Sequence, residues 1–128
     1  MLEAKTENIS QLVHRQATAA SISEIARLLQ EVLSRRLTAY AAGVQDGKTV
    51  TRWASGEVSE IRDIDVERRL RMTYEIVQLL LLQDSAHTVK AWFIGMNPEL
   101  DDVSPVEAIH DGVLKDARDA AHVFFVNG

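Results

Sequence analysis

Apolar residues recur at three- and four-residue steps along most of this chain, the spacing that places side chains on one face of an α-helix. One such run follows Ser21 and Ser23, either of which can cap a helix, and it contains Ile25, Leu28, Leu29, Val32 and Leu33. A longer run begins at Asp63 or Asp65, reaches about Gln83, and contains Val66, Leu70, Tyr74, Ile76, Val77, Leu80 and Leu81. No segment alternates as a β-strand does, so the pattern predicts an all-α fold.

Glycines mark the ends of two shorter helices. These helices are expected over residues 37–42 and 48–55, because Gly43 and Gly56 follow them and can adopt the left-handed conformation that ends a helix. Residues 1–20 carry no clear hydrophobic pattern, so no element is predicted for them and they are interpreted as an N-terminal segment that can be mobile.

Two prolines divide the last third of the chain. Ser85 can cap a helix that ends before Pro98, because proline disfavours helical geometry in the residue before it. Ser104 and Pro105 suit the start of the next helix, and a last helix is expected over residues 113–125.

Composition and charge narrow the functional classes. The chain has 128 residues, 46% of them hydrophobic, which suits one domain or two small domains that share a core. The absence of cysteine excludes disulfides and thiolate-bound zinc. The net charge of −5 is unevenly distributed along the chain. Residues 27–71 contain nine Lys or Arg and seven Asp or Glu, whereas residues 84–128 contain three Lys or Arg and eight Asp or Glu. This asymmetry is compatible with two surfaces for different partners, and equally with chance in a short chain.

The longest apolar run bears on location and assembly. Leu79–Leu82 is too short to span a membrane, and the chain does not begin with a basic flank and an apolar run, so the cytoplasm is the expected location. The same run places leucine on all sides of the long helix. It must be covered by the C-terminal helices or by a second chain, and we expect a homodimer or a hetero-oligomer.

The stretch "LTAYAAGVQDGKTVTRWASGE", residues 37–57, is the first candidate site. Two short helices around a glycine-bearing turn are the geometry that presents a recognition helix to the major groove of DNA. Ala39 is small where the helices cross, and Trp53 fills a core. Donors toward bases and phosphates are Gln45, Lys48, Thr49, Thr51 and Arg52. The alternative is a helical hairpin whose Trp53 only fills a core.

This stretch resembles the helix-turn-helix of the phage-repressor (Xre) family in its alanine, glycine-valine, threonine-valine, arginine-tryptophan and closing glycine. It departs from that pattern by one extra residue between Gly43 and Thr49, with Gly47 expected as an insertion in the turn. A phosphate-contacting surface could extend over Arg62, Arg68, Arg69 and Arg71. The interleaved acids favour instead a solvated helix face with local ion pairs, and they are Asp63, Asp65 and Glu67.

The stretch "SAHTVKAWFIGMNPELDDVSPVEAIHDG", residues 85–112, indicates a helix, a tight corner and a second helix. Trp92 and Phe93 supply large buried area, Leu100 plugs the corner, and the two prolines fix the direction of the chain. The stretch closely resembles the C-terminal domain of the Xre/MbcA/ParS antitoxin family, whose signature is matched by Trp92, Asn97, Pro98, Leu100, Ser104, Pro105, Glu107 and Gly112. The departure is at Asp101 and Asp102, where the family often carries a glycine.

With the helix-turn-helix in front, the resemblance spans most of residues 25–128. It implies a helix-turn-helix domain over residues 21–61, and a long helix with a toxin-binding domain over residues 62–128. It further implies an antitoxin that inhibits a RES-type toxin, an enzyme that destroys NAD, and that often represses its own operon. The toxin-binding domain would be shaped by Trp92, Phe93, Asn97, Pro98, Leu100 and Pro105. The residues expected to plug the entrance of the toxin's active site are Val126, Asn127 and Gly128. Phe124 and Phe125 are expected in the core of this protein more than at its interface with the toxin.

Two other classes of function are alternatives to an antitoxin. One is a stand-alone helix-turn-helix transcription regulator whose C-terminal helices only dimerise it. The other is an enzyme, which is not expected, because the histidines stand at no metal-ligand spacing and no phosphate-cradling glycine loop or nucleophile elbow occurs. No catalytic residue, metal site or cofactor is therefore predicted.

Overall fold

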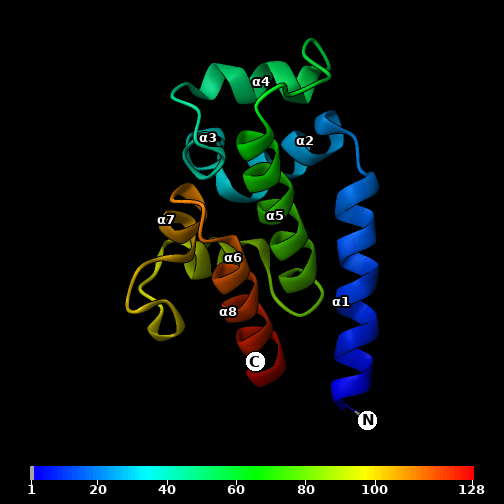
Figure 1. Ribbon diagram of the computed structural model, residues 1–128, viewed down its shortest axis with the longest axis vertical. Coiled ribbons are helices and arrows are strands. Elements are labelled where there is room, and N and C mark those ends of the chain that lie inside the picture. The colour runs from blue at the N-terminus through cyan, green and yellow to red at the C-terminus, as the bar shows by residue number, and fades with distance from the viewer. Residues whose placement is uncertain (1) are drawn as a thin grey trace.

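Within residues 2–128, which the computed structural model describes, the chain forms helices and no strand (Figure 1). The elements are α1 (Leu2–Ala19), α2 (Ile22–Leu33), α3 (Arg35–Ala42), α4 (Gly47–Ser55), α5 (Ile64–Leu80), α6 (Ala86–Ile94), the short 3-10 helix η1 (Pro98–Leu100), α7 (Pro105–His110) and α8 (Leu114–Asn127). Side chains are described from residue 8 onward. The prediction of an all-α fold is confirmed.

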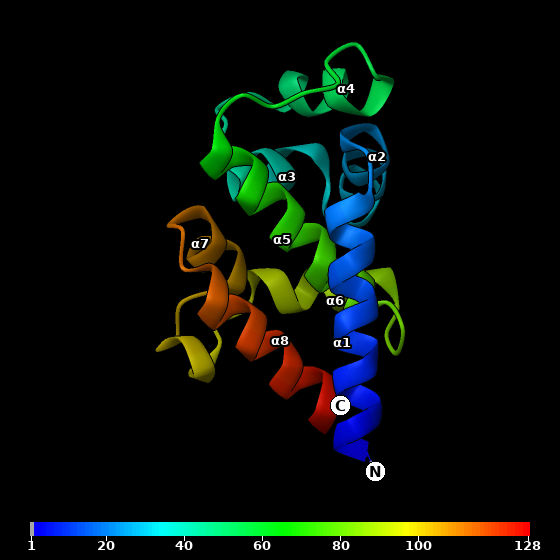
Figure 2. The same ribbon diagram turned by 45° about the vertical axis from the view of Figure 1, so that its right-hand side comes forward.

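Helix α5 is the central element of the fold. It packs against α1, α2, α3, α7 and α8, so helices from both halves of the chain share it. Figure 2 shows α5 between α1 on one side and α7 and α8 on the other, with α4 across the far end. Its fully buried residues Leu70 and Leu80 belong to one hydrophobic cluster with Trp53 of α4 and Phe93 of α6. A single core therefore connects the N-terminal helices to the C-terminal ones.

Most helix boundaries follow from capping residues. Ser21 caps α2 by accepting a hydrogen bond from the Glu24 backbone N–H, and Asp63, Ser85 and Ser104 cap α5, α6 and α7 in the same way. Helices α3 and α4 end at Gly43 and Gly56, both at φ +83°, where glycine is free of the Cβ strain of a left-handed backbone.

Helix α1 is the element that the sequence pattern missed. No element was predicted for residues 1–20, yet residues 2–19 form a helix; Met1 lies outside the described residues. Its buried positions within the described side chains are Val13 and Ala17, and Ala20 follows them. Alanine contributes little to a hydrophobic pattern, although its small side chain lets two helices approach closely. The sequence of this segment therefore shows no apolar face by which the helix could be recognised.

The long helix ends earlier than predicted, and this removes an argument for a dimer. Helix α5 ends at Leu80 rather than near Gln83, and the chain turns over residues 81–84. Leu79 and Leu80 are buried within the chain itself, and Leu81 is partly buried, so of the run Leu79–Leu82 only Leu82 is left 59% exposed. The leucine run thus needs no second chain to cover it. At the other end of the chain, α8 extends to Asn127, two residues beyond the predicted boundary.

Candidate functional site

Helices α2, α3 and α4 form a three-helix unit with the geometry of a helix-turn-helix. All three pairs of these helices pack against each other. In Figure 1, α3 is seen end-on while α4 lies across the view, so the two helices cross steeply. Ala39 of α3 is buried, and Val50 and Trp53 of α4 are 0% and 3% exposed. Trp53 thus fills the core of this unit, as both the DNA-binding and the hairpin interpretations require.

The predicted DNA-binding residues lie on the turn and along α4. Gln45, Lys48, Thr51 and Arg52 are exposed, and Thr49 is partly buried. Lys48, Thr51 and Arg52 are three and four residues apart and therefore share one face of α4, opposite the buried Val50 and Trp53. The structure thus brings the candidate donors together on one surface.

The details of the turn differ from the sequence prediction. Gly47 is the first residue of α4 rather than an insertion in the turn, because the Asp46 side chain caps α4 by accepting from the Lys48 backbone N–H at 2.9 Å. Two of the candidate side chains also have partners within the chain. The Thr51 hydroxyl accepts a hydrogen bond from Arg35 Nη1 at 3.0 Å, and Arg52 Nε lies 3.7 Å from a Glu57 carboxylate oxygen.

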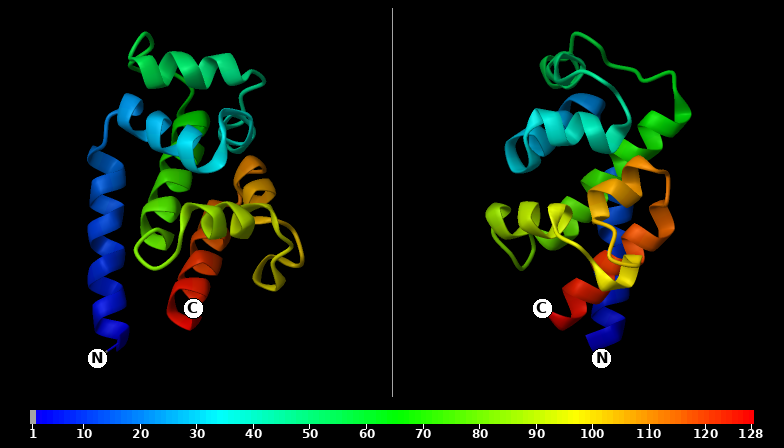
Figure 3. Two further views of the ribbon diagram at one scale, coloured as in Figure 1. Left: turned by 180° about the vertical axis from the view of Figure 1, so that it is seen from behind. Right: turned by 90° about the vertical axis from the view of Figure 1, so that its left-hand side faces the viewer.

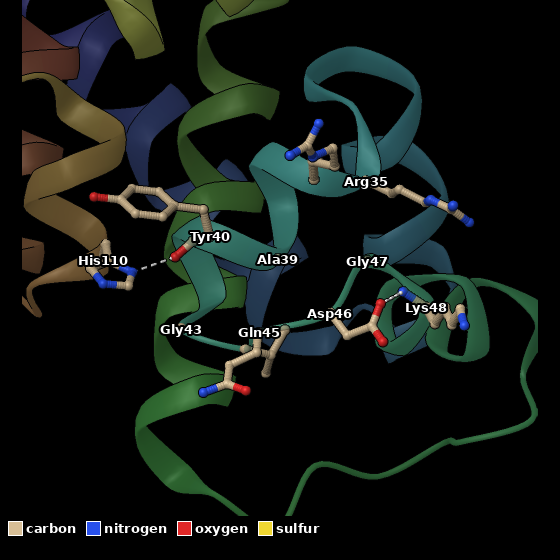
Figure 4. Close-up of a pocket in the computed structure, with 11 residues that line it drawn as sticks. Arg35, Ala39, Tyr40, Gly43, Gln45, Asp46, Gly47, Lys48 and His110 are labelled. Carbon is tan, nitrogen blue, oxygen red and sulfur yellow. Dashed lines mark hydrogen bonds between the residues drawn. The ribbon is translucent and has the colours of Figure 1, made fainter.

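A hollow of about 710 Å³ lies between α3, the turn and the start of α4. Arg35, Arg36 and Lys48 give it a basic lining, against the single carboxylate of Asp46. Figure 4 shows Arg35, Gly47 and Lys48 on one side of this hollow and Tyr40 with His110 on the other. It is therefore a cationic depression beside the helix that carries the candidate donors.

Tyr40 and His110 join this hollow to the C-terminal helices. Their rings stack in parallel with centroids 4.1 Å apart, and His110 Nδ1 donates to the Tyr40 carbonyl oxygen at 2.6 Å, which places a proton on Nδ1. Burial raises the pKa of the Tyr40 hydroxyl, and the negative charges of Glu107 and Asp111 raise it further. The phenol is therefore neutral at physiological pH.

The four arginines of the linking segment and α5 do not form one basic surface. Arg62 and Arg68 are exposed. Arg71 pairs with Glu67 at 2.8 Å, as local pairing predicts, but it also donates to backbone carbonyls at the end of α1. Arg69 packs against Gly43, where a Cβ would lie 3.1 Å from its Nη1. Arg69 and Arg71 therefore hold α3 and α1 against α5 rather than facing a phosphate backbone.

The corner after α6 has the predicted form. Helix α6 ends at Gly95, and the Asn97 side chain accepts from the Glu99 backbone N–H at 2.9 Å to start η1. Asp101 and Asp102 follow at φ +54° and +67°, a left-handed pair where the antitoxin family often carries a glycine. Aspartate tolerates this region better than most residues, so two aspartates can occupy the left-handed positions of this turn.

The predicted toxin-binding residues separate into a buried scaffold and an exposed surface. Phe93 is fully buried, and Asn97, Leu100 and Pro105 are also buried, so these four shape the corner from inside. Trp92, Asn97, Pro98 and Asn127 line a groove of about 320 Å³ between the corner and α8. The rings of Trp92 and Phe93 pack edge to face with their centroids 5.1 Å apart, and the centroids of the Trp92 and Phe124 rings are 6.1 Å apart. Val126 and Gly128 are exposed next to Asn127.

Sequence reasoning missed the most exposed apolar side chains of this region. Met96 is 81% exposed and Ile94 55%, and Val123 adds a third exposed apolar side chain on α8. Met96 and Val123 line the same groove as Trp92. Ile94 directly follows the buried Phe93 on α6, and that helical position away from the core face was the signal that could have revealed it. Phe125 is buried, as expected, and Phe124 is partly buried on the wall of the groove.

A buried ionic cluster lies away from both surfaces. The Glu75 side chain is 7% exposed, and its carboxylate accepts from His14 Nδ1 at 2.8 Å and lies 2.9 Å from Arg118 Nε. It links α1, α5 and α8. Among the described residues, no three or more His, Asp or Glu side chains are arranged to hold a metal ion, and no described helix is long and apolar enough to cross a membrane.

Comparison with known proteins does not assign the chain. No family model matches it, and no curated protein and no solved structure matches it.

Proposed function

We propose that this protein is a cytoplasmic antitoxin that binds a RES-domain, NAD-degrading toxin and inhibits it by occluding the active site. The observation that carries the proposal is the groove at the C-terminal corner, where Trp92, Pro98 and Asn127 lie together beside exposed Met96 and Val123. A concave apolar surface with a large aromatic residue at its wall is typical of a protein-binding site.

The scaffold beneath the groove supports the same function. Phe93 and Leu100 fill the corner from inside, and the Asn97 cap fixes the start of η1, so the surface is formed before a partner arrives. A preformed surface loses less conformational entropy on binding than a flexible one. Val126, Asn127 and Gly128 end α8 at the rim of the groove, from which they can reach a neighbouring active-site entrance.

The helix-turn-helix supports a second activity, repression of the protein's own operon. Its support is the exposed row of Lys48, Thr51 and Arg52 on α4, together with Gln45 on the turn. The competing function is a stand-alone transcription regulator without a toxin partner. The two functions differ in salt response, because DNA affinity falls steeply with salt whereas an apolar protein interface is far less sensitive.

The test is inhibition of a RES-type enzyme encoded beside the gene, measured as NAD consumption at increasing ratios of this protein. Stoichiometric inhibition is expected. Removing Val126–Gly128 is expected to weaken inhibition and to leave DNA affinity unchanged, while the Lys48→Ala/Arg52→Ala double variant does the reverse. Absence of any complex with the enzyme, with operator binding retained, would leave the regulator as the function. Equal loss of both activities in both folded variants would contradict two separate surfaces.

A further inference from the structure

Arg35 is fixed against the candidate recognition helix by two contacts. Its Nη1 donates to the Thr51 hydroxyl of α4 at 3.0 Å. Its side chain also passes over Gly47, the first residue of α4, where a Cβ would lie 3.2 Å from Cγ, 3.4 Å from Nε and 3.5 Å from Cδ. Any side chain at position 47 would therefore push against Arg35.

The backbone before Arg35 directs the side chain toward α4. Ser34 links α2 to α3 directly and has φ +86°, a value that few residues other than glycine adopt. Its hydroxyl accepts from the Leu37 backbone N–H at 3.2 Å and caps α3. Arg35 is thereby the first residue of α3, at the point where α3 faces the start of α4.

Gly47 has a specific role in this arrangement. It does not have a positive φ, so it is not needed for a left-handed backbone. Glycine is also a poor helix former, by about 1 kcal/mol relative to alanine in a helix interior. What glycine provides at position 47 is the space that Arg35 occupies. Gly47 therefore leaves room for the Arg35 side chain to pack against the start of α4.

We propose that Arg35, seated on Gly47 and Thr51, contacts a phosphate of the DNA backbone beside Lys48. Both side chains are exposed and line the basic hollow at the start of α4 (Figure 4). Asp46, the acid of this lining, already caps α4, and Arg36 adds a further positive charge. A guanidinium held by one N–H group keeps its others for an anion, and because it is already held in place, less side-chain entropy is lost on binding. Thr51 then acts as a positioning residue for Arg35. This inference rests on the DNA-binding half of the proposed function.

The test uses the full chain and a labelled duplex from directly upstream of its own gene, with a scrambled duplex of equal length as a second probe. Affinity is measured by fluorescence anisotropy over a series of salt concentrations. Arg35→Ala is expected to weaken binding to both duplexes about tenfold, and to lower the slope of log affinity against log salt by about one. Arg36→Ala is the matched control, since it removes the same charge from the neighbouring residue, which has no contact with Thr51 in this arrangement, and a smaller loss is expected.

Gly47→Ala tests whether the packing of Arg35 against Gly47 matters for binding. It is expected to weaken binding in the wild-type background and to have no further effect in the Arg35→Ala background, because the alanine acts only by displacing Arg35. Circular dichroism and tryptophan fluorescence verify that each variant is folded. Equal losses for Arg35→Ala and Arg36→Ala, an unchanged salt slope, or a loss confined to the upstream duplex would overturn the inference while DNA binding stands. No binding of the wild-type protein to either duplex would overturn both.

Discussion

At the scale of single residues, Glu75 is the least expected feature of the core. A carboxylate that is 7% exposed is stable only because His14 and Arg118 surround it, from α1 and α8. Glu75 is 61 positions from His14 and 43 positions from Arg118 along the chain, so no local pattern could have paired them. A buried charge of this kind holds its neighbours in one arrangement, and breaking the pair costs more than replacing it as a whole.

The Glu75 cluster gives a prediction for stability. Arg118→Met leaves the buried carboxylate without its main partner and is expected to lower the free energy of unfolding by about 3 kcal/mol. The Glu75→Leu/Arg118→Met double variant removes both charges and is expected to recover most of this loss. Urea unfolding of the three proteins measures both changes. A double variant no more stable than Arg118→Met would show that the ion pair itself does not determine the effect.

His122 gives a prediction for pH. Burial lowers its pKa in the folded protein, where its Nδ1 lies 3.1 Å from the Ser10 hydroxyl; Arg118 lowers the pKa further, and Glu75 and Asp119 act in the opposite direction. As pH falls below about 6.5, the unfolded chain takes up a proton at this histidine before the folded one does. Stability from this group is therefore complete above that pH and is lost as pH falls toward the lowered folded pKa.

The corresponding variant is His122→Asn, which keeps a polar group near Ser10 but does not titrate. It is expected to lose less stability than the wild-type protein between pH 7 and pH 5 in urea unfolding. The same loss in both proteins would place the titrating group elsewhere.

At the scale of elements, most of the fold was readable from the sequence. Serine and aspartate caps and the left-handed glycines are local signals, and the structure confirms them at Ser21, Asp63, Ser85, Gly43 and Gly56. What failed depended on distant partners. Helix α1 is recognisable only through its packing against α5, and the space left by Gly47 is explained only by Arg35, twelve positions earlier in the sequence. Phe93 and Leu100 were expected to fill the corner after α6, and both are buried there.

The attachment of α1 gives a prediction at this scale. Arg71 Nη1 donates to the carbonyls of Ala17 and Ala20, both at 2.8 Å, and so satisfies groups at the C-terminal end of α1. Each hydrogen bond from a charged group contributes about 1.5–3 kcal/mol. Arg71→Met is expected to reduce the hydrogen-exchange protection of α1 at least tenfold while α5 keeps most of its own. Arg68→Met, an exposed arginine of the same helix, is the control, and equal loss in α1 and α5 would contradict a local role.

At the scale of the whole molecule, the two candidate surfaces lie apart but share a core. Figure 3 shows the C-terminal end of α8 at the end of the molecule opposite α4, so the C-terminal residues and the candidate DNA-binding helix lie far from each other. One partner can therefore occupy the C-terminal groove without covering α4. Helix α5 packs against α2 and α3 and also against α7 and α8, and Tyr40 of α3 stacks on His110 of α7. The halves are thus joined by packed side chains rather than by a linker alone.

A continuous core predicts that both halves unfold together, and the two tryptophans report on them separately. Trp53 is 3% exposed in the helix-turn-helix, and Trp92 lies on the C-terminal groove. Trp92→Phe leaves only Trp53 and Trp53→Phe leaves only Trp92. In each variant, the fluorescence midpoint in urea is expected to coincide with the midpoint of far-UV circular dichroism. A fluorescence midpoint that departs from circular dichroism in either variant would show that one half unfolds by itself. A midpoint that rises with protein concentration would show that a second chain stabilises the fold.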